Sequence, residues 1–210
     1  MRFAITLDHC LSYRDQGFLE LEGLISQKEI KLILQELPQG NNPEILFSEG
    51  IDLWRKIPSI KKLAMQKKMT AVLARLANCK HLRLAFDQLI PTTGKALKYF
   101  LYQETEATLE SFSSIEGLEC GVIYALKTTG NPSQEHLFPH QAGNGVVIAP
   151  STPLRTAGIE EEGLYLLIVY ASRYSRYVPN PHDPKAARFK HLGYIAGSPL
   201  SDAVNPSVFP

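Results

Sequence analysis

The chain has 210 residues, of which 44% are apolar and 20% are charged, and its formal net charge is +1. This length and apolar content predict one domain over residues 1–210 with a single buried core. The balanced charge gives no general indication of a nucleic-acid or anionic-membrane partner.

The first predicted unit is a short strand followed by an amphipathic helix. Residues 18–21 alternate partly between apolar and polar, as a strand does. Ser26 is a favoured N-cap residue, and Glu29 follows it at the spacing of a capping box. The apolar residues after Glu29 recur at helical spacing until Pro38. The pattern therefore predicts a helix between Ser26 and Pro38.

A loop and a second helix are expected next. Residues 39–50 are rich in Gly, Asn and Pro, which is typical of a loop. Pro58 is a favoured residue in a first helical turn, so the second helix is expected to begin near it. The apolar stripe of this helix consists of Met65, Met69, Val72, Leu73 and Leu76.

Basic residues gather in the same region, from Arg55 to Arg83, and no acid lies between Asp52 and Asp87. Such a stretch is typical of a solvated helix face, and it also fits an anion- or nucleic-acid-binding surface. Its members are Arg55, Lys56, Lys61, Lys62, Lys67, Lys68, Arg75, Lys80 and Arg83.

From residue 82 onward the pattern favours strands. Residues 82–91, 119–126, 145–149 and 164–171 are apolar or alternating runs separated by Gly and Pro. Helices followed by strands predict an α+β fold that is mainly β, a barrel or sandwich flanked by N-terminal helices. We expect a helical flank over about residues 13–80, a β core over about 82–171, and an irregular Pro-rich tail over 178–210. Phe189, Tyr194, Ile195 and Phe209 are the residues through which this tail is expected to pack on the body.

The cysteines and the apolar runs indicate a soluble, cytoplasmic protein. Cys10, Cys79 and Cys120 are odd in number and far apart, which argues against a disulfide framework. The first ten residues contain Asp8 and His9 and lack the long apolar run of a secretory signal. The longest apolar run, residues 164–171, is far shorter than the ~20 residues of a membrane-spanning helix.

Several stretches, in this order along the chain, carry a resemblance to a known family. Tyr13–Leu37 contains a Tyr-x-x-x-Gly-Phe-like strand and a capped helix, Asp87-Gln88-Leu89 lies in a later strand, and Ile123–Leu126 provides an Ala-Leu strand ending. Together they resemble the phytanoyl-CoA dioxygenase family of non-haem iron, 2-oxoglutarate-dependent oxygenases. The resemblance implies a double-stranded β-helix, which is a jelly-roll or cupin-like barrel. The overall pattern is also similar to small hypothetical proteins of chlamydiae.

The iron site that this resemblance implies is missing from the sequence. These enzymes use two His and one carboxylate, with a His-x-Asp/Glu pair, and an Arg that binds the co-substrate. No His in this chain is followed at the second position by Asp or Glu. The resemblance places Tyr102-Gln103-Glu104 at the first ligand segment and Arg155 at the second His. Residues 160–163, which include three Glu, occupy the region of the co-substrate Arg.

We therefore expect an oxygenase-like barrel that binds a small molecule or carries out altered chemistry, with no cofactor. The residues expected to line its pocket are Gln88, Tyr102, Gln103, Glu104 and Arg155. One hypothesis is that Arg155 places its guanidinium where iron would bind and pairs with Glu104, an arrangement that requires its other donors to be satisfied.

Two alternatives remain open. An active oxygenase with atypical ligands would bind Fe(II) through Glu104 and His136 or His140, and would use 2-oxoglutarate. Pro139 argues against a continuous helix across these two histidines.

A metal-dependent DNA-binding regulator would use the basic stretch. However, no helix-turn-helix pattern with a central Gly, His-x-His pair or Cys-x-x-Cys pair is visible, so nucleic acid is not the expected partner. The chain also lacks the Gly-x-Ser-x-Gly elbow of many hydrolases and the Gly-rich phosphate-binding motifs.

Overall fold

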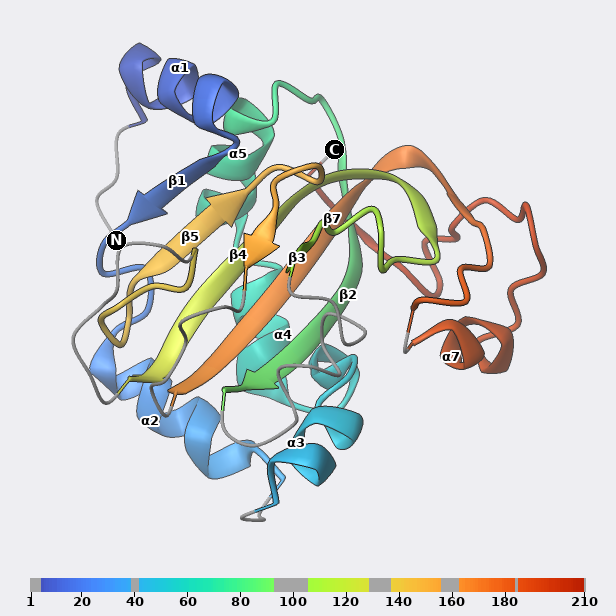
Figure 1. Cartoon of the computed structure of the whole chain (residues 1–210), viewed down its shortest axis with the longest axis horizontal. Coiled ribbons are helices and arrows are strands. Elements are labelled where there is room, and N and C mark those ends of the chain that lie inside the picture. Colours follow the sequence, from blue (N-terminus) through green and yellow to red (C-terminus); the bar gives the residue numbers. More distant parts are fainter. Residues whose placement is uncertain are drawn as a thin grey trace.

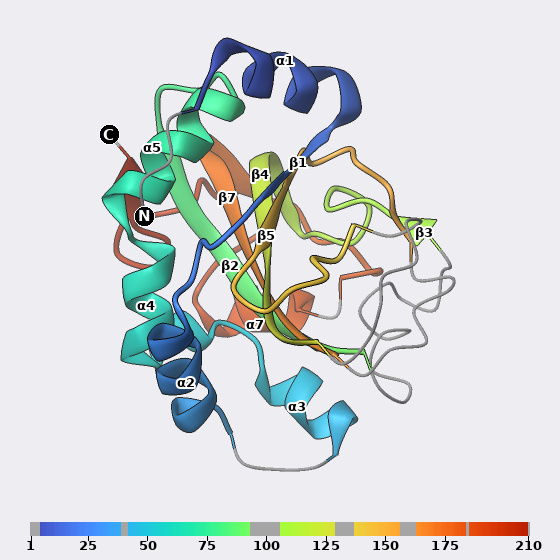
Figure 2. The same cartoon turned by 90° about the vertical axis from the view of Figure 1, so that its left-hand side faces the viewer.

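The protein is built on a curved antiparallel sheet with helices on one of its faces (Figures 1 and 2). The computed structural model describes residues 5–38, 42–92, 106–128, 137–155, 163–183 and 185–209, with residue 155 described through its backbone alone. The helices are α1 (Leu7–Gln16), α2 (Gln27–Glu36), α3 (Pro43–Glu49), the 3₁₀ helix η1 (Leu53–Arg55), α4 (Pro58–Ala64), α5 (Lys67–Leu76) and α7 (Ala186–His191). The strands are β1 (Phe18–Leu21), β2 (Leu82–Pro91), β3 (Glu106–Ala107), β4 (Ile115–Thr128), β5 (Gly145–Ile148), β6 (Leu154–Arg155), β7 (Gly163–Tyr177) and β8 (Ser207–Phe209).

Two sheets are present among the described residues. The larger has six strands in the order β1-β5-β4-β7-β2-β8, and the smaller pairs β3 with β6. Every pairing is antiparallel. Figure 2 shows α2, α4 and α5 on one side of the large sheet and β3 on the other. The expectation of a mixed fold with an antiparallel sheet and N-terminal helices is therefore confirmed.

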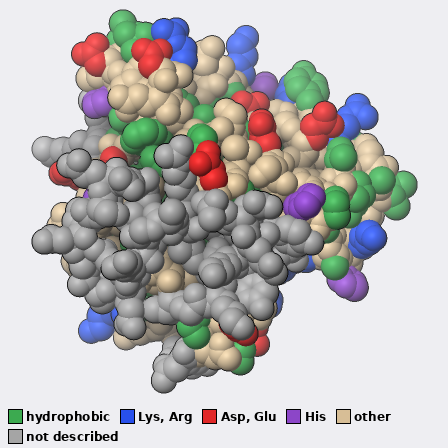
Figure 3. All heavy atoms as spheres, in the orientation of Figure 1, with side chains coloured by type: hydrophobic (Ala, Val, Ile, Leu, Met, Phe, Trp, Pro, Cys, Tyr) green, Lys and Arg blue, Asp and Glu red, His purple; other side chains and the backbone are tan. Residues whose placement is uncertain are grey.

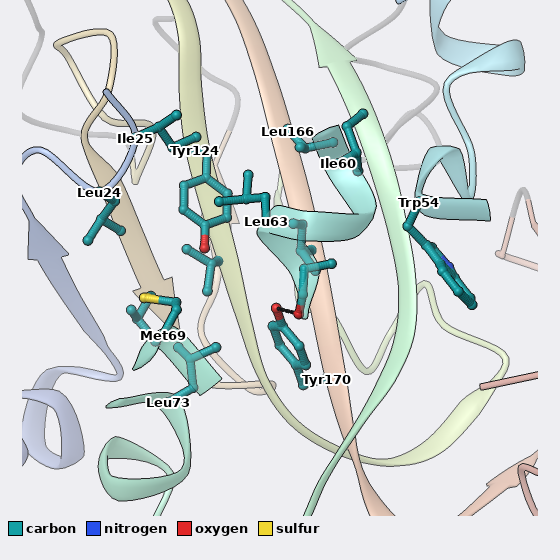
Figure 4. Close-up of a cluster of buried hydrophobic side chains, with 14 of the residues drawn as sticks. Leu24, Ile25, Trp54, Ile60, Leu63, Met69, Leu73, Tyr124, Leu166 and Tyr170 are labelled. Atoms are coloured by element: carbon teal, nitrogen blue, oxygen red, sulfur yellow. Dashed lines mark hydrogen bonds between the residues drawn. The ribbon is translucent and has the colours of Figure 1, made fainter. Parts of the chain in front are cut away.

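The large sheet is apolar on both faces, which explains the nearly continuous apolar runs of its central strands. Along β7, Leu166 and Ile168 pack toward the helices, whereas Leu167 and Val169 pack toward the opposite side, here called the barrel face. The helix-side core includes Leu24, Ile60, Leu63, Met69, Leu73, Tyr124, Leu166, Ile168 and Tyr170 (Figure 4). The barrel-side core includes Phe86, Ile90, Phe112, Ile123, Phe138, Tyr165, Leu167, Val169, Tyr177 and Phe189.

The capping box and the predicted strands are confirmed. The Ser26 hydroxyl accepts a hydrogen bond from the Glu29 amide, and the Glu29 carboxylate accepts one from the Ser26 amide. The resulting helix, α2, buries Ile30 and Ile33. These contacts are local, and for this reason the sequence spacing alone was sufficient to predict them.

Two helical predictions were wrong, and one further helix was not predicted. Residues 43–49 form α3 within the predicted loop, because Asn42 caps the Glu44 amide and Pro43 begins the helix. Residues 7–16 form α1, whose only buried residue is Tyr13, so it has no apolar stripe in the sequence. The predicted second helix is divided into α4 and α5 at Met65.

The C-terminal segment, residues 178–209 without residue 184, contains α7 and β8, where the sequence suggested irregular structure. Strand β8 pairs with the edge of β2. Phe189 and Tyr194 are buried as expected and Phe209 packs at the helix-side core, but Ile195 is 75% exposed. Within the described ranges, no helix has the length and apolar character needed to cross a membrane.

Candidate functional site

Asp87 and Gln88 are adjacent polar residues on β2. The Asp87 side chain points toward the helices and caps the N-terminal end of η1. Its Oδ1 accepts a hydrogen bond from the Leu53 amide at 2.9 Å, and its Oδ2 accepts one from the Trp54 amide at 3.0 Å. Burial raises the pKa of this fully buried carboxyl to about 7; the negative charge of Asp52 adds to the rise, and the two amide hydrogen bonds oppose it. Asp87 therefore has a structural role in joining the sheet to the helical layer.

Gln88, the next residue, has the opposite orientation, on the barrel face. Its Nε2 donates hydrogen bonds to the carbonyls of Phe47 and Leu89, each at 2.9 Å. Its Oε1 is buried and has no hydrogen-bond partner among the described residues. The residue paired with it across the ladder is Leu167 of β7, so this acceptor lies in apolar surroundings. Of the predicted pocket residues, Gln88 is the one whose side chain lies in the described part of the chain.

The β3–β6 ladder pairs the backbone at Arg155 with a strand that begins two positions after Glu104 in the sequence. Glu106 is the register partner of Arg155, and Ala107 is that of Leu154. Tyr102, Gln103, Glu104 and His136 lie outside the described residues, as do residues 160–162. The ion pair between Arg155 and Glu104 stays a prediction.

His140, the described member of the predicted metal pair, is half-buried in the connection between β4 and β5. Over the ranges that the structure describes, no group of three or more His, Cys, Asp or Glu side chains is arranged to hold a metal ion. The three cysteines are unpaired thiols.

Two arginines of the basic stretch bind the C-terminal segment instead of forming an open surface. The Arg55 Nη1 donates to the Val204 carbonyl at 2.6 Å, and the Arg83 Nη1 donates to the Asn205 carbonyl at 2.9 Å. Arg83 also lies 3.2 Å from the Asp202 carboxylate. The exposed members are Lys56, Lys61, Lys62, Lys67, Lys68, Arg75 and Lys80. Figure 3 shows the opposite side of the molecule, where acidic and basic side chains are interspersed on the described part.

A charged cluster around Asp52 was not predicted from the sequence. The Asp52 Oδ2 lies 2.9 Å from Arg188 Nε of α7 and 3.2 Å from Arg55 Nε. Arg188 also donates through Nη1 to the Ile51 carbonyl at 2.7 Å. These bonds join α7 to the start of η1. No local signal in the sequence could reveal them, because α7 follows far along the chain.

A second buried charge pair was also missed and lies on the barrel side. The Lys185 Nζ is 3.0 Å from the Asp183 Oδ1, and the two side chains are 2% and 0% exposed. The rings of Phe86 and Phe112 in the barrel-side core flank the ammonium group. The sequence offered a weak sign, a Lys and an Asp two positions apart in a Pro-rich segment.

Comparison with known proteins identifies relatives by fold. The chain matches no protein-family model and no curated protein sequence. The structure is similar to SnoK, a non-haem α-ketoglutarate-dependent carbocyclase of nogalamycin biosynthesis, with a TM-score of 0.67 at 15% identity over 97% of this chain and 96% of that one. The epimerase SnoN of the same biosynthesis gives 0.61 at 15% identity over 97% and 98%. CT296 from Chlamydia trachomatis gives 0.53 at 15% identity over 82% and 98%.

These likenesses show that the chain has the fold of the non-haem α-ketoglutarate-dependent enzymes. The iron and co-substrate of that fold need two His, a carboxylate and a cationic clamp. The sequence contains no His-x-Asp/Glu pair. The match of Arg155 to the second His stays a prediction.

Proposed function

We propose that this protein is an oxygenase-like barrel that binds a small molecule without the standard iron and 2-oxoglutarate site, and that any reaction it carries out differs from the standard one. The proposed architecture is a complete double-stranded β-helix, related to the phytanoyl-CoA dioxygenase family. The residues proposed to form its pocket are Gln88 on β2, Tyr102, Gln103, Glu104 and Arg155. No resident cofactor is part of the proposal.

The observation that supports this proposal is the unpartnered Oε1 of Gln88. A buried acceptor without a donor costs about 1–3 kcal/mol, and such atoms are rare in native proteins. The side chain is held by two hydrogen bonds from Nε2, so the orientation of Oε1 is fixed. A bound molecule with an N–H or O–H group would satisfy this acceptor, which explains why a polar side chain is retained among apolar residues.

Isothermal titration of metal-stripped protein with Mn(II) under anaerobic conditions, with and without 2-oxoglutarate, tests whether the protein binds a divalent metal. We expect no binding heat in either case. One-site binding that 2-oxoglutarate strengthens would contradict the proposal. It would favour the alternative of an active oxygenase with atypical ligands, namely Glu104 with His136 or His140.

Native mass spectrometry of the purified protein tests whether it carries a bound small molecule. We expect a small-molecule adduct that denaturation releases. Gln88→Met and Gln88→Glu both lose the donor to the Phe47 carbonyl, but Gln88→Glu keeps an acceptor oxygen at the same place. Retention of the adduct by Gln88→Glu and its loss from Gln88→Met would assign the binding to Oε1. Equal retention by both variants would contradict this role.

A further inference from the structure

Lys185 belongs to the C-terminal segment, but its side chain ends inside the barrel-side core. The ammonium nitrogen lies 4.5 Å from the ring centroid of Phe86 on β2 and 5.1 Å from that of Phe112. Each of the two rings is 1% exposed. A cation within about 6 Å of an aromatic face is attracted by the negative charge of that face, and the attraction is larger where water is excluded.

The carboxylate of Asp183 completes the surroundings of the ammonium group. Its Oδ2 accepts a hydrogen bond from the Ser114 amide at 2.7 Å, directly before β4. Its Oδ1 accepts from the Lys185 amide at 2.8 Å and lies 3.0 Å from the Lys185 Nζ. The backbone bonds hold the carboxylate in place, so its position does not depend on the lysine side chain alone.

Placing a charged group in this buried space has a large desolvation cost. Moving an ammonium group out of water costs far more than burying a Met or Leu of similar size, unless every contact suits the charge. Here two aromatic rings and one carboxylate lie close to a single nitrogen. Aromatic rings are also the groups with which proteins recognise quaternary ammonium ligands.

We propose that Phe86, Phe112 and Asp183 form a pocket for an organic primary ammonium group, and that Lys185 is its built-in occupant. The C-terminal segment is thus held on the barrel by a contact of the same kind as ligand binding. This inference goes beyond the proposed function, because it does not depend on whether a ligand reaches Gln88 or whether a metal binds.

Chemical rescue tests the pocket. The Lys185→Ala variant lacks three methylene groups and the nitrogen, which n-propylammonium chloride can restore. We expect this compound to raise the thermal midpoint of Lys185→Ala in a saturable manner. At tenfold excess over its dissociation constant it should raise the folded-to-unfolded ratio about 11-fold. Equal concentrations of NaCl and of propan-1-ol, which has the same number of heavy atoms without the charge, are expected to give no such rise.

The wild type and Lys185→Met serve as matched controls, since both have a filled pocket, one with and one without the charge. Neither is expected to respond to n-propylammonium. A response of Lys185→Met equal to that of Lys185→Ala, or equal rescue by propan-1-ol, would overturn the proposal. The first result would show an unrelated site, and the second would show an apolar cavity without preference for ammonium.

Should Lys185→Ala not fold, the wild-type protein still allows a test by lysine ammonium ¹H–¹⁵N correlation spectroscopy. One ammonium signal is expected to be protected from solvent exchange and shifted upfield by the ring currents of Phe86 and Phe112. Replacing one ring, in Phe112→Leu, should reduce that shift. Absence of a protected ammonium signal in the folded wild type would overturn the proposal.

Discussion

Asp87 and Trp54 are joined by a hydrogen bond of 3.0 Å from the Trp54 backbone amide to the Asp87 carboxylate. The bond connects the middle of β2 to the first turn of η1, and the second carboxylate oxygen makes the same kind of bond to Leu53. The acid in the Asp-Gln-Leu stretch that suggested an oxygenase is therefore part of the scaffold. Gln88 beside it remains the residue that faces the barrel.

The first prediction concerns the pH dependence that Asp87 causes. Its pKa in the folded protein is about 7, against a usual 3.8. The folded state therefore holds this proton at pH values where the unfolded state has released it. As the pH rises between these two values, the free energy of unfolding should fall by up to about 1.4 kcal/mol per pH unit from this group, and above the folded pKa no further change is expected.

Urea unfolding across this pH range, compared between the wild type and Asp87→Asn, measures the effect. The variant should lose this part of the slope, whatever its absolute stability. Asp202→Asn is the control, because Ser207 and Arg83 lower the pKa of that exposed carboxyl, so its contribution changes only below pH 3.8 and the slope over the tested range should match that of the wild type. An unchanged slope in Asp87→Asn would show that Asp87 is ionised throughout the range.

The second prediction compares two buried tyrosines of the helix-side core. The Tyr170 hydroxyl donates to the Ala64 carbonyl at the end of α4 at 2.8 Å (Figure 4). The Tyr124 hydroxyl, in contrast, has no partner within the described part of the chain. Tyr170→Phe should lower the free energy of unfolding by about 1–3 kcal/mol, because it leaves a buried carbonyl unpaired. Tyr124→Phe should be neutral or stabilising. Equal losses in the two variants, measured by urea unfolding, would contradict the assigned hydrogen bonding.

The third prediction concerns Asn205, which holds the C-terminal segment at the irregular part of β2. Its Nδ2 donates to the carbonyls of Leu84 and Ala85 at 2.9 and 2.6 Å, beside the β-bulge, and its Oδ1 accepts from the Tyr194 hydroxyl at 2.9 Å. Asn205→Ala should cost about 2–4 kcal/mol, because several buried groups lose their partners together.

Hydrogen exchange provides the matching local measurement. The amides of β8 should exchange faster in Asn205→Ala than in the wild type, since β8 pairs with the same strand. Tyr194→Phe removes only the hydroxyl and should have a smaller effect. Unchanged protection of β8 in Asn205→Ala would show that the strand pairing does not need this side chain.

The fourth prediction concerns nucleic acid. Arg55 and Arg83 are engaged by the C-terminal segment, whereas the other seven basic residues of the stretch are exposed, as is typical of a solvated helix face. We expect no DNA retardation at low salt, and no difference between the wild type and a Lys67→Gln/Lys68→Gln variant. Binding that weakens steeply with salt and is reduced in the variant would support the regulator hypothesis instead.

The sequence alone was sufficient to predict the helices and strands that depend on interactions between residues close together in the chain. The capping box of Ser26 and Glu29 involves residues only three positions apart. The apolar runs of β2, β4 and β7 are continuous within each strand, so each strand could be predicted without knowing its neighbours. The resemblance carried by such segments predicted an oxygenase-like fold, which the similarity to solved structures supports, whereas the complete double-stranded β-helix stays a prediction. Helix α3 was missed although Asn42 and Pro43 are favourable start signals, because a helix this short shows too little periodicity.

The partners of the buried polar side chains could be found only from the tertiary structure. Arg83 bonds to the Asn205 carbonyl 122 positions away, and Asp87 bonds to an amide 33 positions away. Lys185 reaches two aromatic rings that come from other parts of the chain. Periodicity in a sequence reports which face of an element is buried, but it carries no information on which distant group will meet a given charge. That choice depends on strand register and on the path of the C-terminal segment, and both are set only when the chain has folded.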